Sequence, residues 1–255
     1  MIRANQQEHM KLLQLPQRPK KQRKIGITSI SDHGIPINLL QDYLNSYSCF
    51  IDIVKLGIGS ALIEPQLKEK ISIYKKNNVE VYFGGTLFEK YYLHNKILEY
   101  KNLLSECHVS SLEISSGIID IPLKERISLV EQFRTDDFNV YAEVGKKDST
   151  YDAAPSLWIN EIKNFIEAGC CKVITEGRDF GTAGIYESQG SVRRGLIDEI
   201  VNKIDHKFII FEAPTEKNQM YFINLLGSNV NLGNIEITKI LILECQRLKL
   251  RYETF

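Results

Sequence analysis

The stretch KVITEGR, residues 172–178, is a short β-branched run that ends on a carboxylate and is followed by helical sequence. β-branched residues are typical of strands. The same succession of strand, polar residue and helix recurs along the chain. The runs, each given with the polar residue that ends it, are Lys24–Ser31 with Asp32, Ile51–Val54 with Lys55, Val79–Gly85 with Thr86, Val109–Leu112 with Glu113, Asn139–Ala142 with Glu143, Lys172–Thr175 with Glu176, Phe208–Phe211 with Glu212, and Asn229–Val230 with Asn231.

Eight such strands separated by helices predict a single-domain (β/α)8 barrel of the α/β class, for which 255 residues is a normal length. The segments that open at Pro65 and Pro155 carry apolar residues at helical spacing. Residues 1–22 have no clear period and predict an N-terminal arm, so that residues 23–255 form the barrel. The chemistry of such barrels lies at the C-terminal ends of the strands, and the polar residues found there therefore predict an enzyme site.

The composition excludes several other classes of protein. The 32 basic and 32 acidic side chains cancel, which argues against a nucleic-acid binder. No apolar run approaches the roughly 20 residues that cross a bilayer, and no signal peptide is visible, so we expect a cytoplasmic protein without a membrane partner. The five cysteines form no CxxC pair and the histidines no HxH or HxxxH spacing, which argues against a disulfide framework or a zinc site.

Period-two alternation predicts which strand-end side chains share the barrel mouth. Glu176 and Arg178 should face the same way, as should Glu143 and Lys147, whereas Lys146 should point elsewhere if the strand stays regular. Carboxylates without histidine or thiolate favour a hard cation such as Mg²⁺. The cations at the mouth favour a substrate that carries phosphate or carboxylate. These cations are Lys55, Lys147 and Arg178.

Each feature alone has a simpler explanation. A single strand-end carboxylate can be an ion-pair partner of a neighbouring strand, and Lys55 can reach such a partner instead of a substrate. The Gly84-Gly85-Thr86 turn can serve backbone packing, and the Gly181–Gly184 stretch is only a weak phosphate-loop motif. A binding site becomes the better interpretation when all eight strand ends are considered together.

Several stretches resemble the phosphosulfolactate synthase family, in register from about Gly26 to Thr254. The family implies a barrel enzyme that adds sulfite to phosphoenolpyruvate with Mg²⁺, giving (2R)-phospho-3-sulfolactate. The resembling stretches are IDIVKLGIGS at 51–60, GGTLFE at 84–89, LEIS at 112–115, EVGKKD at 143–148, EGR at 176–178, FEAP at 211–214 and NVNLGNI at 229–235.

The resemblance also implies roles for individual residues. Lys147 matches the family lysine that would protonate C2 of the substrate, and a homo-oligomer is expected. The expected metal ligands are Glu113, Glu143 and Glu176, and the expected substrate-binding residues are Lys55, Arg178, Gly181, Thr182, Asp32 and Asn231.

The chain departs from the family pattern at a few positions. Ser116 stands where the family often has Asp or Asn, RDFG at 178–181 replaces a frequent RESG, and Ile58 replaces a frequent tryptophan. Two alternatives therefore stay open at this point. One is a non-catalytic, stress-associated barrel protein, and the other is a different Mg²⁺-dependent lyase that acts on a phosphorylated small acid.

Overall fold

The computed structural model describes residues 4–148, 153–178 and 180–255, and it confirms the predicted (β/α)8 barrel. Eight parallel strands pair in chain order, and β8 pairs with β1 to close the sheet. The strands are β1 Thr28–Asp32, β2 Ile53–Leu56, β3 Glu80–Phe83, β4 Ser111–Ile114, β5 Asn139–Val144, β6 Lys172–Thr175, β7 Ile209–Glu212 and β8 Leu232–Ile235.

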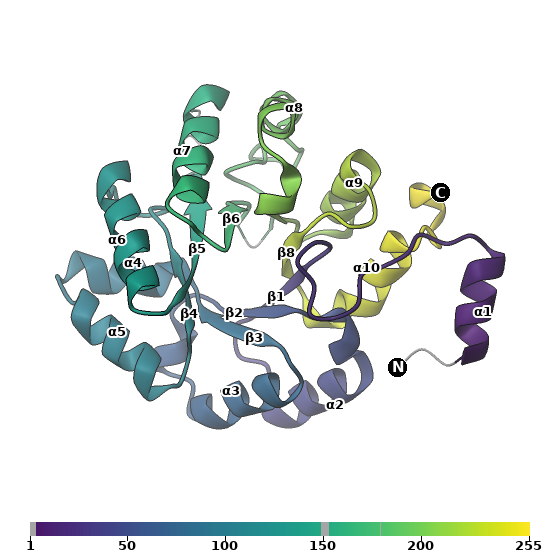
Figure 1. Ribbon diagram of the computed structural model, residues 1–255, viewed down its shortest axis with the longest axis horizontal. Helices are drawn as coiled ribbons and strands as arrows, with labels where there is room; N and C mark the ends of the chain where they lie inside the picture. Colours follow the sequence, from purple (N-terminus) through teal and green to yellow (C-terminus); the bar gives the residue numbers. More distant parts are fainter. Residues whose placement is uncertain (1–3, 149–152, 179) are drawn as a thin grey trace.

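Helices surround this barrel (Figure 1). They are α2 Ile37–Tyr47, α3 Leu67–Lys76, α4 Gly85–Leu93, α5 Ile97–Glu106, α6 Leu123–Thr135, α7 Pro155–Glu167, α8 Arg194–Lys203, α9 Glu216–Leu226 and α10 Ile240–Arg247. Short 3-10 helices lie at Ser48–Phe50, Ser60–Leu62, His206–Phe208, Ile237–Lys239 and Tyr252–Thr254. Within the described residues, no helix is long and apolar enough to cross a membrane.

The apolar side chains form two separate cores because alternate strand residues face opposite sides of the sheet. Val54 and its equivalents pack outward against the helices. A smaller cluster fills the inside of the barrel, where the rings of Tyr82 and Tyr141 stack with centroids 5.0 Å apart. The inner cluster contains Ile27, Ile53, Tyr82, Tyr141, Ile174 and Ile210.

This inner cluster sets the direction of the charged residues. Lys55, Glu143, Glu176 and Glu212 each come two positions after one of its members, so their side chains face inward at the C-terminal end of the barrel.

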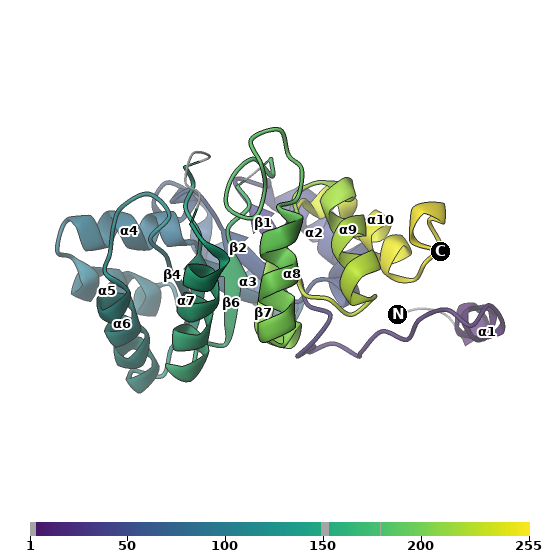
Figure 2. The same ribbon diagram turned by 90° about the horizontal axis from the view of Figure 1, so that it is seen from above.

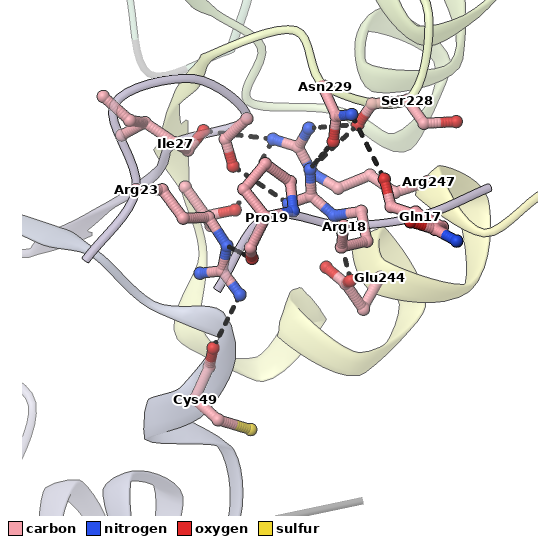
Figure 3. Close-up of polar contacts among 12 residues, drawn as sticks. Gln17, Arg18, Pro19, Arg23, Ile27, Cys49, Ser228, Asn229, Glu244 and Arg247 are labelled. Carbon is pink, nitrogen blue, oxygen red and sulfur yellow. Dashed lines mark hydrogen bonds and ion pairs between the residues drawn. The ribbon is translucent and has the colours of Figure 1, made fainter. Parts of the chain in front are cut away.

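Side-chain contacts hold the segment before β1 against the N-terminal end of the barrel. The helix α1, Ala4–Leu12, stands apart from the other helices in both views (Figure 1, Figure 2). Further along, the Arg18 guanidinium donates to Oε1 of Glu244 at 3.0 Å and to Oδ1 of Asn229 at 2.5 Å (Figure 3). Arg23 donates to both carboxylate oxygens of Asp52, at 3.0 and 3.1 Å. The segment that follows α1 is thereby held against α10 and the strand starts.

Candidate active site

A cavity of about 240 Å³ opens at the C-terminal ends of the strands, where the sequence predicts the site. His33, Thr86 and Asn234 contribute to its wall. Its charged lining residues are Lys55, Glu113, Glu143, Lys147, Glu176, Arg178 and Glu212. One cavity thus brings together three cations and four carboxylates from five strands or the loops that follow them.

Lys55 is paired with a carboxylate in this cavity. Its Nζ lies 2.5 Å from Oε1 of Glu212, and the second oxygen of Glu212 accepts from the backbone N–H of Gly177 at 2.9 Å. Burial lowers the pKa of Lys55, but the charges of Glu212 and Glu113 outweigh that effect and hold the pKa well above its ordinary value. Lys55 is therefore a permanent cation, oriented by Glu212 on the opposite side of the barrel.

Lys147 lies among three polar partners. Its Nζ is 3.6 Å from Oε2 of Glu176, 3.9 Å from Oε1 of Glu143 and 3.3 Å from Oγ1 of Thr86. Lys146 instead donates to Oδ1 of Asp120 at 2.6 Å, outside the cavity. The prediction that these adjacent lysines face different ways is confirmed.

Lys146 and Lys147 face different ways because of a backbone turn, and not because of strand alternation alone. Strand β5 ends at Val144, and Gly145 follows with a φ of +118°, a conformation open mainly to glycine. A Cβ at Gly145 would lie 2.6 Å from the Trp158 ring and 2.8 Å from Cβ of Glu176. A tight turn thus follows the strand, and the backbone N–H of Lys147 donates to the Gly117 carbonyl at 3.0 Å.

Glu113, Glu143 and Glu176 are buried, and each has an oxygen without a hydrogen bond: Oε2 of Glu113, Oε1 of Glu143 and Oε2 of Glu176. Burial raises the pKa of all three carboxyls, and the pKa of Glu143 reaches about 8 because Lys147 only partly offsets the loss of hydration. Buried carboxylate oxygens that accept no hydrogen bond are the donors that a hard cation prefers.

No group of three or more Asp, Glu, His or Cys side chains within the described residues is close enough to hold a metal ion. The three glutamates therefore match a cation in donor chemistry but do not form a ready-made ligand set.

Gly85 brings a helix start against one of these glutamates. Its N–H donates to Oε1 of Glu113 at 2.7 Å. A Cβ at Gly85 would lie 2.2 Å from Oγ of Ser115 and 2.5 Å from the Glu113 carboxylate. The glycine of the GGT turn is thus needed for close packing against β4.

Arg178 enters the cavity from a left-handed backbone position with a φ of 55°. Its N–H donates to Oε1 of Glu176 at 2.6 Å, and its carbonyl accepts from Nδ2 of Asn234 at 2.9 Å. Asn234 in turn accepts from Oγ of Ser31 at 2.5 Å. These bonds tie the β6 loop to the ends of β8 and β1.

Two predicted site residues lie elsewhere. The Asp32 side chain faces the helix layer, where Oδ2 accepts from the Tyr74 hydroxyl at 2.9 Å and Nζ of Lys70 lies 3.4 Å away. Asn231 precedes β8 and bonds the Ile27 N–H and the Ile209 carbonyl at the opposite end of the barrel. The prediction that these two residues reach the mouth is wrong, because Asp32 has outward parity and β8 begins later than expected.

Gly181 and Thr182 are absent from the described residues that line the cavity. A Cβ at Gly181 would lie 3.0 Å from Oδ1 of Asn218 and 3.6 Å from Pro214, so this loop packs over the start of α9. Asp179, which belongs to the RDFG departure, lies outside the described residues.

Sequence reasoning missed Asn234 and His33 as cavity residues. Asn234 lies within the NVNLGNI stretch, and the end of β8 at Ile235 places it at the mouth. A Cβ at Gly57 would lie 2.5 Å from Nε2 of His33. The glycine therefore leaves room for the imidazole of His33.

Comparisons with known proteins show the family of this chain. The family model described as (2R)-phospho-3-sulfolactate synthase (ComA) matches residues 16–253. A phosphosulfolactate synthase of Bacillus subtilis strain 168 is 40% identical over 246 residues, which cover 95% of this chain and 97% of that protein. One from Methanocaldococcus jannaschii is 38% identical over 235 residues, covering 90% and 94%.

Among solved structures, the YdjI aldolase of Escherichia coli K12 superposes with a TM-score of 0.55 at 11% identity, covering 91% of each chain, and shows the fold alone. The range matched by the family model contains the whole barrel and the residues that line the cavity. The chain therefore belongs to the (2R)-phospho-3-sulfolactate synthase family of enzymes.

Proposed function

We propose that this enzyme adds sulfite to C3 of phosphoenolpyruvate and releases (2R)-phospho-3-sulfolactate. The observation that carries the proposal is the cavity that holds Lys55, Lys147 and Arg178 beside glutamates with oxygens that accept no hydrogen bond, in a chain of this family. A trianionic substrate and an anionic nucleophile need several cations to meet in one small cavity.

The reaction is an addition across the enol double bond. The sulfur lone pair of sulfite forms the new bond to C3, and the π electrons move through C2 into the carboxylate. C2 then takes up one proton as the electrons return from the resulting aci-carboxylate. The net change is the gain of sulfite and a proton, with the phosphate ester intact.

In this proposal Lys147 delivers the proton to C2. Burial lowers the pKa of Lys147, but Glu143, Glu176 and Glu113 outweigh it, so the pKa lies above its ordinary value and the ammonium keeps its proton at neutral pH. The same glutamates make Lys147 a weaker acid, since efficient proton donors have a pKa near the working pH. Donation therefore requires that the charge of the glutamates is offset once the site is loaded.

Arg178 and Lys55 hold the anions. Arg178 offers a planar guanidinium, which suits a phosphate or carboxylate with two oxygens. Lys55 keeps its charge beside Glu212 at 2.5 Å and adds positive charge on the other side of the cavity.

Mg²⁺ is the cation that fits this donor set. It often takes one or two carboxylates and completes its shell with water and substrate oxygens. Glu113, Glu143 and Glu176 would supply those carboxylates, because each has a buried oxygen that accepts no hydrogen bond. When bound, the ion supplies stabilisation of negative charge on a substrate oxygen.

We also propose a cytoplasmic location, because all five cysteines are free thiols, as is usual in a reducing compartment. The expected homo-oligomer stays a prediction that size-exclusion chromatography with light scattering can test.

Loss of phosphoenolpyruvate, followed through the ultraviolet absorbance of its double bond, tests the proposed reaction. Loss should require sulfite, and sulfate should not replace it because sulfate has no lone pair on sulfur. Loss of phosphoenolpyruvate at the same rate without sulfite would contradict the proposal.

A further inference from the structure

A second cavity lies at the opposite end of the barrel and plays no part in the proposed reaction. Its volume is about 670 Å³, well above the 240 Å³ of the mouth and within the range of small-molecule sites. Its walls come from the segment 21–24 and from the starts of β2, β3, β5 and β6. The inner apolar cluster of the barrel separates it from the active-site cavity.

Positive charge exceeds negative charge along these walls. The cations are Lys21, Arg23, Lys24, Lys75 and Lys172, against two carboxylates, Asp52 and Glu80.

Both carboxylates already have partners. Asp52 accepts two bonds from Arg23, at 3.0 and 3.1 Å. Glu80 accepts from Oγ of Ser111 at 2.6 Å. Arg23 offsets the charge of Asp52, whereas Glu80 keeps its charge, so four lysines face one uncompensated carboxylate.

The lysines on this cavity lack carboxylate partners. Nζ of Lys21 donates to the carbonyls of Ser48 and Asn77, at 2.7 and 2.8 Å. Lys24 and Lys172 form no ion pair with any residue in the described ranges. Burial lowers the pKa of Lys21 to about 8 and also lowers that of Lys172, as expected for ammonium groups whose charge is poorly compensated.

The floor of this cavity is apolar. Ile27, Ile53 and Tyr141 belong both to its lining and to the inner cluster of the barrel. A ligand that fits such a site carries an anionic group for the lysines and an apolar body for the floor.

We propose that this cavity, defined by Lys24, Lys172 and the Ile27–Ile53–Tyr141 floor, binds a small organic phosphate at a site separate from the active site. Phosphate is favoured because several compact ammonium groups suit a dianion. Lys24 belongs to the segment before β1 and Lys172 begins β6, so the ligand would bridge these two parts of the chain. The inference stands independently of the proposed reaction.

Cys171 offers a reporter located at this site. Its thiol is exposed and lines the cavity, whereas Cys245 is half-buried on α10 and does not line it. The experiment alkylates the whole protein with and without phenyl phosphate and measures the rate for each cysteine peptide by mass spectrometry. At a ligand concentration about ten times Kd, alkylation of Cys171 should slow about tenfold, since only the unliganded fraction reacts. Cys245 should react at an unchanged rate.

Three variants locate the binding. Lys172→Glu should abolish the protection, and Lys203→Glu, the same charge change on the exposed end of α8, should leave it intact. Arg178→Ala, which removes a cation of the active-site cavity, should also leave it intact. Protection is the ratio of the two rates within one variant, so any change in intrinsic thiol reactivity cancels.

The proposal is overturned if phenyl phosphate does not slow Cys171, or if the protection survives Lys172→Glu or disappears in Arg178→Ala. Lys24→Glu, at an exposed position, provides a second test should Lys172→Glu fold poorly. Inorganic phosphate should protect less than phenyl phosphate because it cannot contact the apolar floor. Equal protection by both probes would overturn the assignment of an organic ligand.

Discussion

Nζ of Lys147 lies 3.6 Å from Oε2 of Glu176, so the loops that follow the neighbouring strands β5 and β6 meet at the barrel mouth. Lys147 follows the turn at Gly145 and lines the cavity. The Glu176 oxygen that it contacts accepts no hydrogen bond. A proton donor and a candidate cation ligand are thereby adjacent, and each can be tested separately.

Replacing the proposed proton donor should affect turnover more than binding. Lys147→Ala should lower kcat by on the order of 10²–10⁴-fold, the usual contribution of a positioned general acid. The KM for phosphoenolpyruvate should change less, since Arg178 and Lys55 remain. Steady-state kinetics would measure both. Lys146→Ala is the matched control and should have little effect, because Lys146 is bound to Asp120 outside the cavity. Equal losses in the two variants would disprove the role of Lys147.

Removal of divalent cations should abolish the activity. Each of Glu113, Glu143 and Glu176 has one buried oxygen that accepts no hydrogen bond, and the single Lys147 ammonium is shared between Glu143 and Glu176. EDTA should therefore stop turnover, and added Mg²⁺ should restore it. Glu176→Gln should raise the Mg²⁺ concentration needed for half-maximal rate. Full activity of metal-free protein would rule out a ligand role for these glutamates.

The stability of the metal-free protein should depend on the ionisation of Glu143. Burial raises the pKa of this carboxyl to about 8, so between its unfolded value and that pH the folded state holds more protons than the unfolded state. Stability should therefore decrease as the pH rises through this window, by up to about 1.4 kcal/mol per pH unit for one group.

Urea denaturation at several pH values would measure this slope. Glu143→Gln should make it shallower but not remove it, because burial also raises the pKa of Glu113 and Glu176. Parallel curves for the variant and the wild type would show that Glu143 does not titrate in this range.

Glu89 should be important for stability. This buried carboxylate on α4 accepts from the Ser115 hydroxyl and from the N–H groups of Gly117, Ile118 and Ile119, the last three at 2.9 Å. Glu89→Ala would leave these donors unpaired and should cost about 3 kcal/mol or more. Chemical denaturation is the measurement. The exposed Glu99 on α5 is the control, and its replacement by Ala should change the midpoint little. A similar midpoint for Glu89→Ala and wild type would contradict this role.

Alternation along the strands accounts for the part of the site that could be predicted from the sequence. Glu143, Glu176 and Glu212 each follow an apolar inner residue by two positions, and the same spacing places Lys55. Their side chains therefore share the mouth once the barrel closes.

The same rule failed where hydrophobicity does not mark the inner face. In β1 the inward positions are Ser29 and Ser31, whereas Ile30 packs outward, so Asp32 follows Ile30 to the outside. The stretch NVNLGNI has few β-branched residues, and its strand begins at Leu232, three residues later than expected. Asn234 therefore lies at the mouth in place of Asn231. Lys147 reaches the cavity through the turn at Gly145, which alternation alone does not describe.

The most direct test of the account is phosphorus NMR of phosphoenolpyruvate incubated with sulfite, Mg²⁺ and purified protein, run beside Lys147→Ala. We expect the phosphoenolpyruvate signal to be replaced by one phosphate-ester signal, with no inorganic phosphate, because the addition leaves the ester intact. The variant should convert substrate at on the order of 10²–10⁴-fold lower rate. No conversion by the wild-type protein, or conversion with release of phosphate, would contradict it.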